Sequence, residues 1–265
     1  MLLDNKIAVV YGAGGAIGGA VARAFAREGA AVFLAGRTRG KLEAVAEDIR
    51  SAGGTADVAT LDALDPAAVT RHADAVAAKA GRIDVAMNAL GFVHVQGKMF
   101  ADLSMDEYIR PIDDYARAQF SVARAVAPHM MAQRRGVIIN LSTPGSFLLV
   151  DGTLGYGIAC AVKETFSRKL AGELGPHGIR TICIRPHAIP QAAAAGSHAN
   201  QVFAPAAEAA GLSIAEMLAG AAESTPLKRL PTLTQVADTA AFAASDSAGA
   251  MTGAILDLSS GTIVN

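Results

Sequence analysis

The chain has few of the residues that mark several classes of protein. Its 265 residues include no Trp and only two cysteines, Cys160 and Cys183, so neither a disulfide framework nor a metal site is expected. A net charge of −1 gives no reason to expect a nucleic-acid or membrane partner. No apolar run is long enough to span a bilayer, and the N-terminus is too short and polar for a signal peptide. We therefore expect a cytoplasmic setting.

Apolar residues are abundant and make up 52% of the chain. A chain of this length can bury a large core, and its length suits one α/β domain. No linker, internal repeat or charge run divides it. We therefore expect residues 1–265 to form one domain.

Residues 6–37 carry the strongest local pattern. A β-branched apolar run over residues 6–11 predicts a buried strand, a helical pattern follows up to residue 29, and residues 31–35 form a second apolar run. The turn between strand and helix is rich in glycine, which adopts positive φ angles and lets a pyrophosphate approach the backbone. This pattern predicts a mononucleotide-binding βαβ unit, whose turn carries Gly12, Gly14, Gly15, Ile17 and Gly18.

The same alternation of strands and helices continues along the chain. Further strands are expected at residues 55–61, 83–88, 137–141, 179–184 and 254–258. Helices are expected at residues 41–51, 66–80, 104–134, 156–174, 205–223 and 235–245, with Pro111 kinking or dividing the third of them. This order predicts a doubly wound parallel sheet with helices on both faces. Residues 187–226 are the least regular part and are interpreted as a substrate loop or lid.

These features resemble the short-chain dehydrogenase/reductase family over essentially the whole chain. The family's glycine motif TGxxxGxG is similar to residues 11–18, where Tyr11 replaces the Thr and Ala16 the middle Gly. The resemblance implies a Rossmann-type sheet of about seven strands. It also implies an oxidoreductase that binds NAD(H) or NADP(H) and forms a homo-oligomer, a dimer or a tetramer.

The end of the second strand bears on the choice of cofactor. A carboxylate there would bind the ribose 2′-hydroxyl of NAD, but this chain has Arg37. A guanidinium can bind a 2′-phosphate with a charge-assisted fork, and Arg39 can assist it. NADP(H) is therefore predicted in preference to NAD(H). The resemblance places further cofactor contacts at Asp62, Ala63, Asn88, Ala89 and Ile189.

The catalytic residues of the family match less closely. The resemblance implies that Tyr156 is the acid/base and that Thr143, thirteen residues upstream, or its neighbour Ser142 orients the substrate oxygen. The family's Lys four residues after the Tyr is Cys160 here, and its Asn on the long helix is Tyr115. A Tyr without a nearby cation has a pKa near 10 and is a poor base at neutral pH.

Lys163 is the candidate for the missing cation. It lies two helical turns after Tyr156, and the Tyr-x6-Lys spacing is similar to that of enoyl-acyl carrier protein reductases. Matching the end of the helix, however, puts that branch's Lys at position 160. Lys163 is thus either a displaced substitute or a solvated helix lysine, and we favour the second. Cys160 is interpreted as a small packing residue.

The residues expected near the pocket are mostly apolar, which suits a small apolar carbonyl or alcohol substrate: Phe92, Val93, Phe100, Phe147, Leu148, Leu149, Leu154 and Phe203. Among the loop histidines, His187 is the candidate for a substitute proton donor.

Three hypotheses follow. The first is an NADP(H)-dependent oxidoreductase. The second is a dinucleotide-binding sensor or partner subunit with little turnover, suggested by Cys160, Tyr115 and His187. The third is a cofactor-free lyase similar to halohydrin dehalogenases. We rank the third last because that branch loses the glycine turn and keeps the cation.

Overall fold

The computed structural model describes residues 1–195 and 197–264. Within these residues seven parallel strands form one sheet in the order β3-β2-β1-β4-β5-β6-β7. The predicted doubly wound Rossmann-type sheet is confirmed. The strands are β1 (Ile7–Tyr11), β2 (Ala31–Gly36), β3 (Thr55–Thr60), β4 (Val85–Asn88), β5 (Gly136–Leu141), β6 (Ile179–Pro186) and β7 (Ile255–Leu258).

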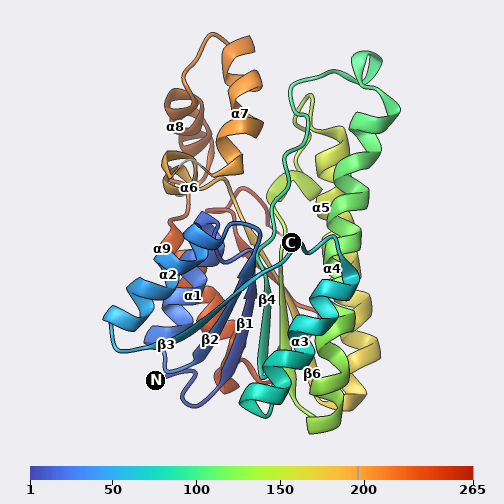
Figure 1. The fold of residues 1–265 in the computed structure, drawn as a ribbon. Coiled ribbons are helices and arrows are strands. Elements are labelled where there is room, and N and C mark those ends of the chain that lie inside the picture. Colours follow the sequence, from blue (N-terminus) through green and yellow to red (C-terminus); the bar gives the residue numbers. More distant parts are fainter. Residues whose placement is uncertain (196, 265) are drawn as a thin grey trace.

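Helices cover both faces of the sheet (Figure 1). One face carries α1 (Ala16–Arg27), α2 (Arg39–Ser51) and α9 (Leu233–Ala244). The other carries α3 (Pro66–Ala80), α4 (Met105–Gln133) and α5 (Leu154–Leu174). Beyond one end of the strands lie α6 (Pro190–Ala194), α7 (His198–Ala209) and α8 (Ile214–Ser224), which we call the α6–α8 lobe.

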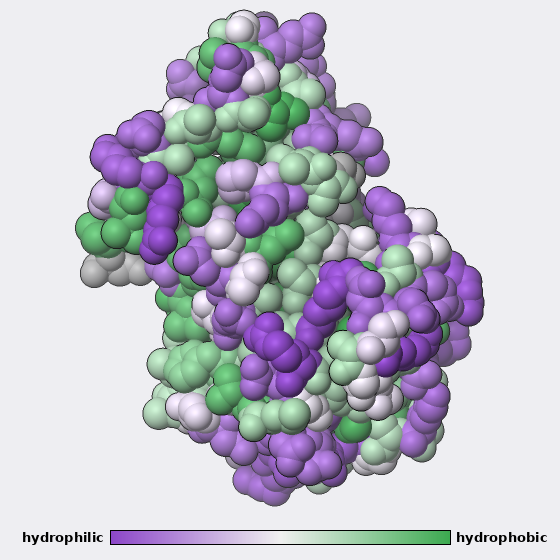
Figure 2. Space-filling view, turned by 90° about the vertical axis from the view of Figure 1, so that its left-hand side faces the viewer, coloured by the Kyte–Doolittle hydropathy of each residue, from purple (hydrophilic) through white to green (hydrophobic). Residues whose placement is uncertain are grey.

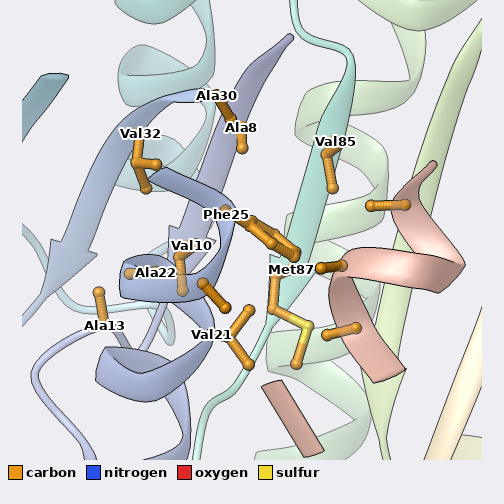
Figure 3. Close-up of a cluster of buried hydrophobic side chains, with 14 of the residues drawn as sticks. Ala8, Val10, Ala13, Val21, Ala22, Phe25, Ala30, Val32, Val85 and Met87 are labelled. Carbon is orange, nitrogen blue, oxygen red and sulfur yellow. The ribbon is translucent and has the colours of Figure 1, made fainter. Parts of the chain in front are cut away.

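Buried apolar side chains fix α1 against the sheet. Figure 3 shows Phe25 of α1 pointing toward Met87 of β4, with Val10 and Val21 beside them. All four side chains are fully buried. Burying a side chain as large as Phe contributes about 2–3 kcal/mol to stability. This contact fixes α1, and therefore the glycine turn before it, against the centre of the sheet.

The strand order places a crevice at the carboxyl ends of β1 and β4. The chain runs from β1 outward to β2 and β3, and then returns to β4 on the other side of β1. Helices that leave two neighbouring strands in opposite directions open a gap between their first turns, and ligands of such sheets bind there. The residues that follow β1 and β4 are therefore positioned to form a site.

Gly12 and Gly18 are required by the fold of the glycine turn. Gly12 has φ +83°, and a Cβ there would lie 2.6 Å from the Ala89 carbonyl oxygen. A Cβ on Gly18 would lie 2.2 Å from the Gly12 carbonyl oxygen. The turn and the start of α1 are thus in backbone contact, which no other residue type permits.

Replacing Gly18 by Ala should therefore destabilise the protein by about 1–3 kcal/mol, because the added methyl group overpacks a backbone contact. Gly172→Ala in α5 is the matched control, since nothing lies within 4 Å of the Cβ it adds. Calorimetric melting should show a lower midpoint for Gly18→Ala and an unchanged or higher one for the control. Equal midpoints would show that the turn has room for the added methyl group.

The structure corrects one of the expected helices. The single helix expected at residues 205–223 is wrong, because α7 and α8 meet at a bend of 86°. Gly211 has φ +67° in the break, and the Ser213 side chain and Glu216 form a capping box that starts α8. Pro111 does not divide the long helix, because α4 continues through it to Gln133.

The face that bears α2 and the α6–α8 lobe mixes hydrophobic and hydrophilic groups (Figure 2). Among the described residues no single helix is long and apolar enough to cross a membrane, while the bent pair of α7 and α8 meets that test by length and composition alone.

Candidate active site

A cavity of about 350 Å³ opens at the carboxyl ends of the central strands. Gly14, Gly15 and Arg37 line one part of it, and Tyr156 and Lys163 line another. The two motifs that the sequence separates by more than a hundred residues therefore share one cavity. Its size is within the range of small-molecule sites.

The glycine turn leaves the start of α1 open to this cavity. Gly15 is the N-cap residue of α1, and no side chain there accepts a hydrogen bond from the first turn. Gly14 and Gly15 line the cavity without side chains. The first amides of a helix have no partner within the helix, and its dipole favours an anion at this end. The turn therefore fits the diphosphate of a dinucleotide.

Cations line the cavity where β2 ends. Arg37 and Lys41 both border it, with the Thr38 side chain beside them. Arg39 does not border it and forms an ion pair with Glu43 at 2.8 Å. Lys41 was not predicted from the sequence, because its distance from the end of β2 along the chain gives no sign that α2 brings it to the cavity.

Most of the other predicted cofactor residues also border the cavity, namely Gly12, Ile17, Asp62, Ala63, Ala89 and Ile189. Two do not. Gly18 is buried beneath the turn. Asn88 is buried at the end of β4, and its side-chain Oδ1 accepts a hydrogen bond from the Leu90 amide at 3.3 Å. The structure gives both a role in shaping the loops rather than in lining the cavity.

Tyr156, near the start of α5, stacks on His94. Their rings are nearly parallel, with centroids 4.1 Å apart. The His94 Nδ1 lies 2.8 Å from the Phe92 carbonyl oxygen, and Gln96 Nε2 lies 2.9 Å from His94 Nε2. Because a carbonyl only accepts and an amide NH₂ only donates, His94 is the neutral tautomer with its proton on Nδ1. This contact was not predicted from the sequence, since the two residues come from distant segments.

The structure distinguishes the two candidate hydroxyls. Ser142 is buried, and its hydroxyl lies 2.9 Å from the Glu164 carboxylate. Thr143 borders the cavity. Its hydroxyl interacts with the Tyr156 phenol, and this interaction by itself lowers the pKa of the phenol. Thr143 is therefore the better placed of the two to reach a molecule in the cavity. Its hydroxyl also lies 3.2 Å from the Cys160 sulfur.

Lys163 is not solvated, so the favoured interpretation of this residue is wrong. Its side chain is only 7% exposed and borders the cavity. Its Nζ lies 4.0 Å from the Tyr115 ring centroid and 5.7 Å from that of Tyr156. Burial opposes the charge of Lys163, but the neighbouring Cys160 and Tyr115 favour it, and its pKa is raised overall. A helix lysine is thus held as an ammonium between two aromatic rings.

Burial dominates the ionisation of Tyr156. Burial, together with the neighbouring Cys160 and Tyr115, raises the pKa of the phenol well above its ordinary value of 10. Tyr156 is therefore neutral at physiological pH and can act as a proton donor. Cys160 is fully buried, as expected for a packing residue.

The apolar residues expected around the pocket are only partly there. Phe92 and Phe203 line the cavity. Val93, Phe100, Phe147, Leu149 and Leu154 are exposed on the surface instead. Loop residues carry no periodicity that tells which side chains turn inward, so this expectation depended on position in the chain alone. His187 does border the cavity, and its Nδ1 accepts a hydrogen bond from the Ala188 amide at 2.7 Å.

Unfolding should become easier as the pH falls from 7 to 5. Burial lowers the pKa of His94 to about 4, so the folded state stays neutral while the unfolded imidazole takes up a proton near pH 6.5. The unfolded state binds more protons in this window, and His94 alone should cost up to about 2 kcal/mol by pH 5. His72, whose pKa burial also lowers to about 4, adds to the same trend.

Urea unfolding at pH 7 and pH 5 checks this prediction. His94→Phe keeps a ring against Tyr156 but cannot be protonated, so its free energy of unfolding should fall less between the two pH values. The same fall in wild type and variant would mean that His94 takes up its proton in the folded state.

Comparison with known proteins identifies the family. Residues 12–262 match a family model described as Enoyl-(Acyl carrier protein) reductase. The 7α-hydroxysteroid dehydrogenase of Clostridium sardiniense is 28% identical over 98% of this chain and 94% of its own length. Oxidoreductase UcpA of Escherichia coli O157:H7 is 31% identical over 95% of this chain and 92% of its own. The chain belongs to the short-chain dehydrogenase/reductase family. The resemblance inferred from the glycine turn and Tyr156 is therefore confirmed.

Solved structures agree with this assignment. A 7α-hydroxysteroid dehydrogenase complexed with NADH and 7-oxo glycochenodeoxycholic acid has a TM-score of 0.86 and 26% identity, and the match covers 99% of this chain and 96% of that one. The resemblance implies a Lys at position 160 and an Asn at position 115, where this chain has Cys160 and Tyr115.

Proposed function

We propose that the protein is an NADP(H)-dependent oxidoreductase that interconverts a small apolar carbonyl compound and its alcohol. The observation that carries the proposal is the cavity itself. The cavity is bordered on one side by a helix N-terminus that suits a diphosphate. It is also bordered by a protonated Tyr156, with Thr143 and Lys163 beside it. Separate sites for these groups would have argued against an oxidoreductase.

The chain's residues fit the dinucleotide at three points. The backbone of Gly14 and Gly15 would hold the diphosphate, and Arg37 with Lys41 would hold a 2′-phosphate. Asp62 and Ala63 would contact the adenine. When bound, the nicotinamide supplies the hydride for reduction or accepts it in oxidation.

The remaining chemistry is the movement of a proton at the substrate oxygen. In reduction the Tyr156 hydroxyl donates its proton to that oxygen, and the Thr143 hydroxyl donates a hydrogen bond that orients it. The phenol becomes a phenolate as the alcohol forms. The Lys163 ammonium, near the Tyr156 ring, stabilises that negative charge. Solvent then returns a proton to the phenolate, which restores Tyr156; a further turnover would also need a fresh reduced dinucleotide.

The substrate end of the cavity favours an apolar molecule. Phe92, Val202 and Phe203 line it, the last two from α7. These contacts support a role of the α6–α8 lobe as the lid inferred for residues 187–226, whose movement would admit substrate and exclude water. Among the described residues that line the cavity, Asp62 is the only one with a carboxylate, and it follows β3, where the adenine is placed.

Arg37→Ala should weaken NADPH binding by about 10- to 100-fold, because one charge-assisted fork to the 2′-phosphate is lost. NADH binding should change little, since NADH lacks that phosphate. Arg39→Ala is the matched control, because Arg39 pairs with Glu43 and does not border the cavity. Titration of wild type and both variants with each cofactor, followed by fluorescence, measures the six affinities. A wild type that binds NADH as tightly as NADPH would defeat the NADP(H) assignment.

A second candidate function is a dinucleotide-binding protein without turnover. The loss of the family's Lys and Asn, at Cys160 and Tyr115, favours it. One result distinguishes the two candidate functions. The second requires that the protein binds NADPH and reduces no carbonyl compound. The lyase alternative receives no support, since the glycine turn that such enzymes lose is intact.

A further inference from the structure

Two oppositely charged side chains are buried against the segment that carries Thr143, residues 142–147, which we call the Thr143 turn. Glu164 of α5 is 2% exposed and Arg185 of β6 is 1% exposed, and Arg185 Nη1 donates a hydrogen bond to Glu164 Oε2 at 3.3 Å. Removing two ions from water is unfavourable unless their other hydrogen-bonding atoms are also satisfied. The remaining contacts of this pair therefore indicate what it does in the interior.

The second oxygen of Glu164 binds the Thr143 turn at two points. The hydroxyls of Ser142 and Ser146 donate to Glu164 Oε1 at 2.9 Å and 2.7 Å. Each hydroxyl has one proton to donate, and the charged carboxylate is the closest acceptor of both. One carboxylate oxygen thus holds the chain on both sides of Thr143.

The turn in its own right fixes Thr143. The Thr143 side-chain Oγ1 accepts a hydrogen bond from the Gly145 amide at 3.3 Å, and its backbone carbonyl accepts one from the Ser146 amide at 3.2 Å. The place of the Thr143 hydroxyl at the cavity therefore follows from the shape of the turn. That shape in turn depends on the carboxylate that binds Ser142 and Ser146.

Arg185 ties this arrangement to the sheet. It lies opposite Asp257 in the register of β6 and β7, and its Nε and Nη2 lie 2.8 Å and 2.7 Å from Asp257 Oδ2. Its guanidinium carbon also lies 4.7 Å from the ring centroid of Phe147, the last residue of the Thr143 turn. Arg185 is thus held by a neighbouring strand and contacts the turn both directly and through Glu164.

We propose that Glu164 is a positioning residue for the Thr143 hydroxyl. Its carboxylate, fixed by Arg185, holds Ser142 and Ser146 so that the hydroxyl between them stays directed at the substrate oxygen. Glu164 touches neither substrate nor cofactor and acts through the turn alone. As a statement about the reaction, the inference rests on the proposed function.

Glu164 has a second neighbour, and the test must separate the two effects. Burial opposes the charge of Lys163, and Glu164 is one of the groups that raise the pKa of Lys163. A substitution of Glu164 would therefore change that lysine as well as the turn. Substitutions of the two serines leave the carboxylate and its pairing with Arg185 in place, so their effect reports on the turn.

Steady-state kinetics of the double variant Ser142→Ala/Ser146→Ala tests the proposal. We expect kcat with the ketone on which the wild type is fastest to fall about 10- to 100-fold, because a small misplacement of an orienting group is costly. The KM for NADPH should stay within about twofold of the wild-type value. Ser245→Ala is the matched control, since this buried serine donates only to the Phe242 carbonyl, at 2.7 Å, and does not border the cavity.

The same substitutions in a Thr143→Val background show whether the serines act through Thr143. Without that hydroxyl there is nothing left to position, so kcat should change less than about twofold on adding them. Equal fold losses in both backgrounds overturn the proposal, and so does a fully active Thr143→Val variant. A double serine variant that melts at a lower temperature but keeps the wild-type kcat would make the bonds to Glu164 structural only, which also overturns it.

Crystal structures of the unliganded wild type and of the double serine variant provide a test without turnover. We expect a single Thr143 side-chain conformation with its hydroxyl at the cavity in the wild type, and a displaced or second conformation in the variant. An unmoved Thr143 in the variant contradicts the positioning role. A wild type that reduces no carbonyl compound defeats the proposed function and leaves this crystallographic comparison standing.

Discussion

Tyr156→Phe is expected to lower the rate of carbonyl reduction by at least about 10²- to 10⁴-fold, the usual contribution of a general acid. The variant loses one hydroxyl and keeps the ring that stacks on His94 with centroids 4.1 Å apart. The fold and the cofactor half of the cavity should therefore be unchanged. Turnover of a panel of small apolar ketones with NADPH, followed by absorbance of the cofactor, measures the loss.

Tyr115→Phe is the matched control for this prediction. Its hydroxyl accepts a hydrogen bond from the Phe92 amide at 3.2 Å and lies in the same aromatic cluster. If Tyr156 is the proton donor, the control should retain much more activity than Tyr156→Phe. The reverse order would transfer the role to Tyr115, and undiminished turnover of Tyr156→Phe would remove Tyr156 from the mechanism.

Lys163→Met should lower turnover by about 10- to 100-fold, because each unit by which the ammonium lowers the pKa of a neighbouring phenolate is worth a factor of ten. Lys169→Met on the exposed face of the same helix should have no effect. Steady-state kinetics of both variants with the ketone on which the wild type is fastest provides the comparison.

A rescue variant separates the charge of Lys163 from its packing. In the Lys163→Met background, Cys160→Lys places an ammonium one turn closer to Tyr156, beside the Thr143 hydroxyl. Activity should then recover in part. If Lys163→Met is fully active, the chain works without a nearby cation, and the proposed role of Lys163 is wrong.

The sheet was predictable because its signals are local. Each strand is a short apolar run followed by a turn and a periodic helix, and the glycine turn depends on backbone geometry that only Gly provides. The α6–α8 lobe was less predictable because its Ala-rich segments have little contrast between faces. The capping box at Ser213 and Glu216, next to Gly211, was nevertheless a readable break signal.

The candidate site was predictable where the backbone or a strand end defines it. Gly14, Gly15, Arg37 and Tyr156 all border the cavity. The state of Lys163 was not predictable, because its burial depends on Tyr115, which another helix supplies. The same reason hid the stacking of His94 on Tyr156. Contacts between distant segments leave no periodic trace in the sequence.

The central claim is that the open start of α1 holds the diphosphate of a nicotinamide dinucleotide. Isothermal titration of the purified protein with NADPH, and separately with NADH, tests it most directly. We predict saturable binding of one NADPH per chain, with a dissociation constant in the range of about 1–100 µM and weaker binding of NADH. Absence of heat with either dinucleotide at millimolar concentration would contradict the account.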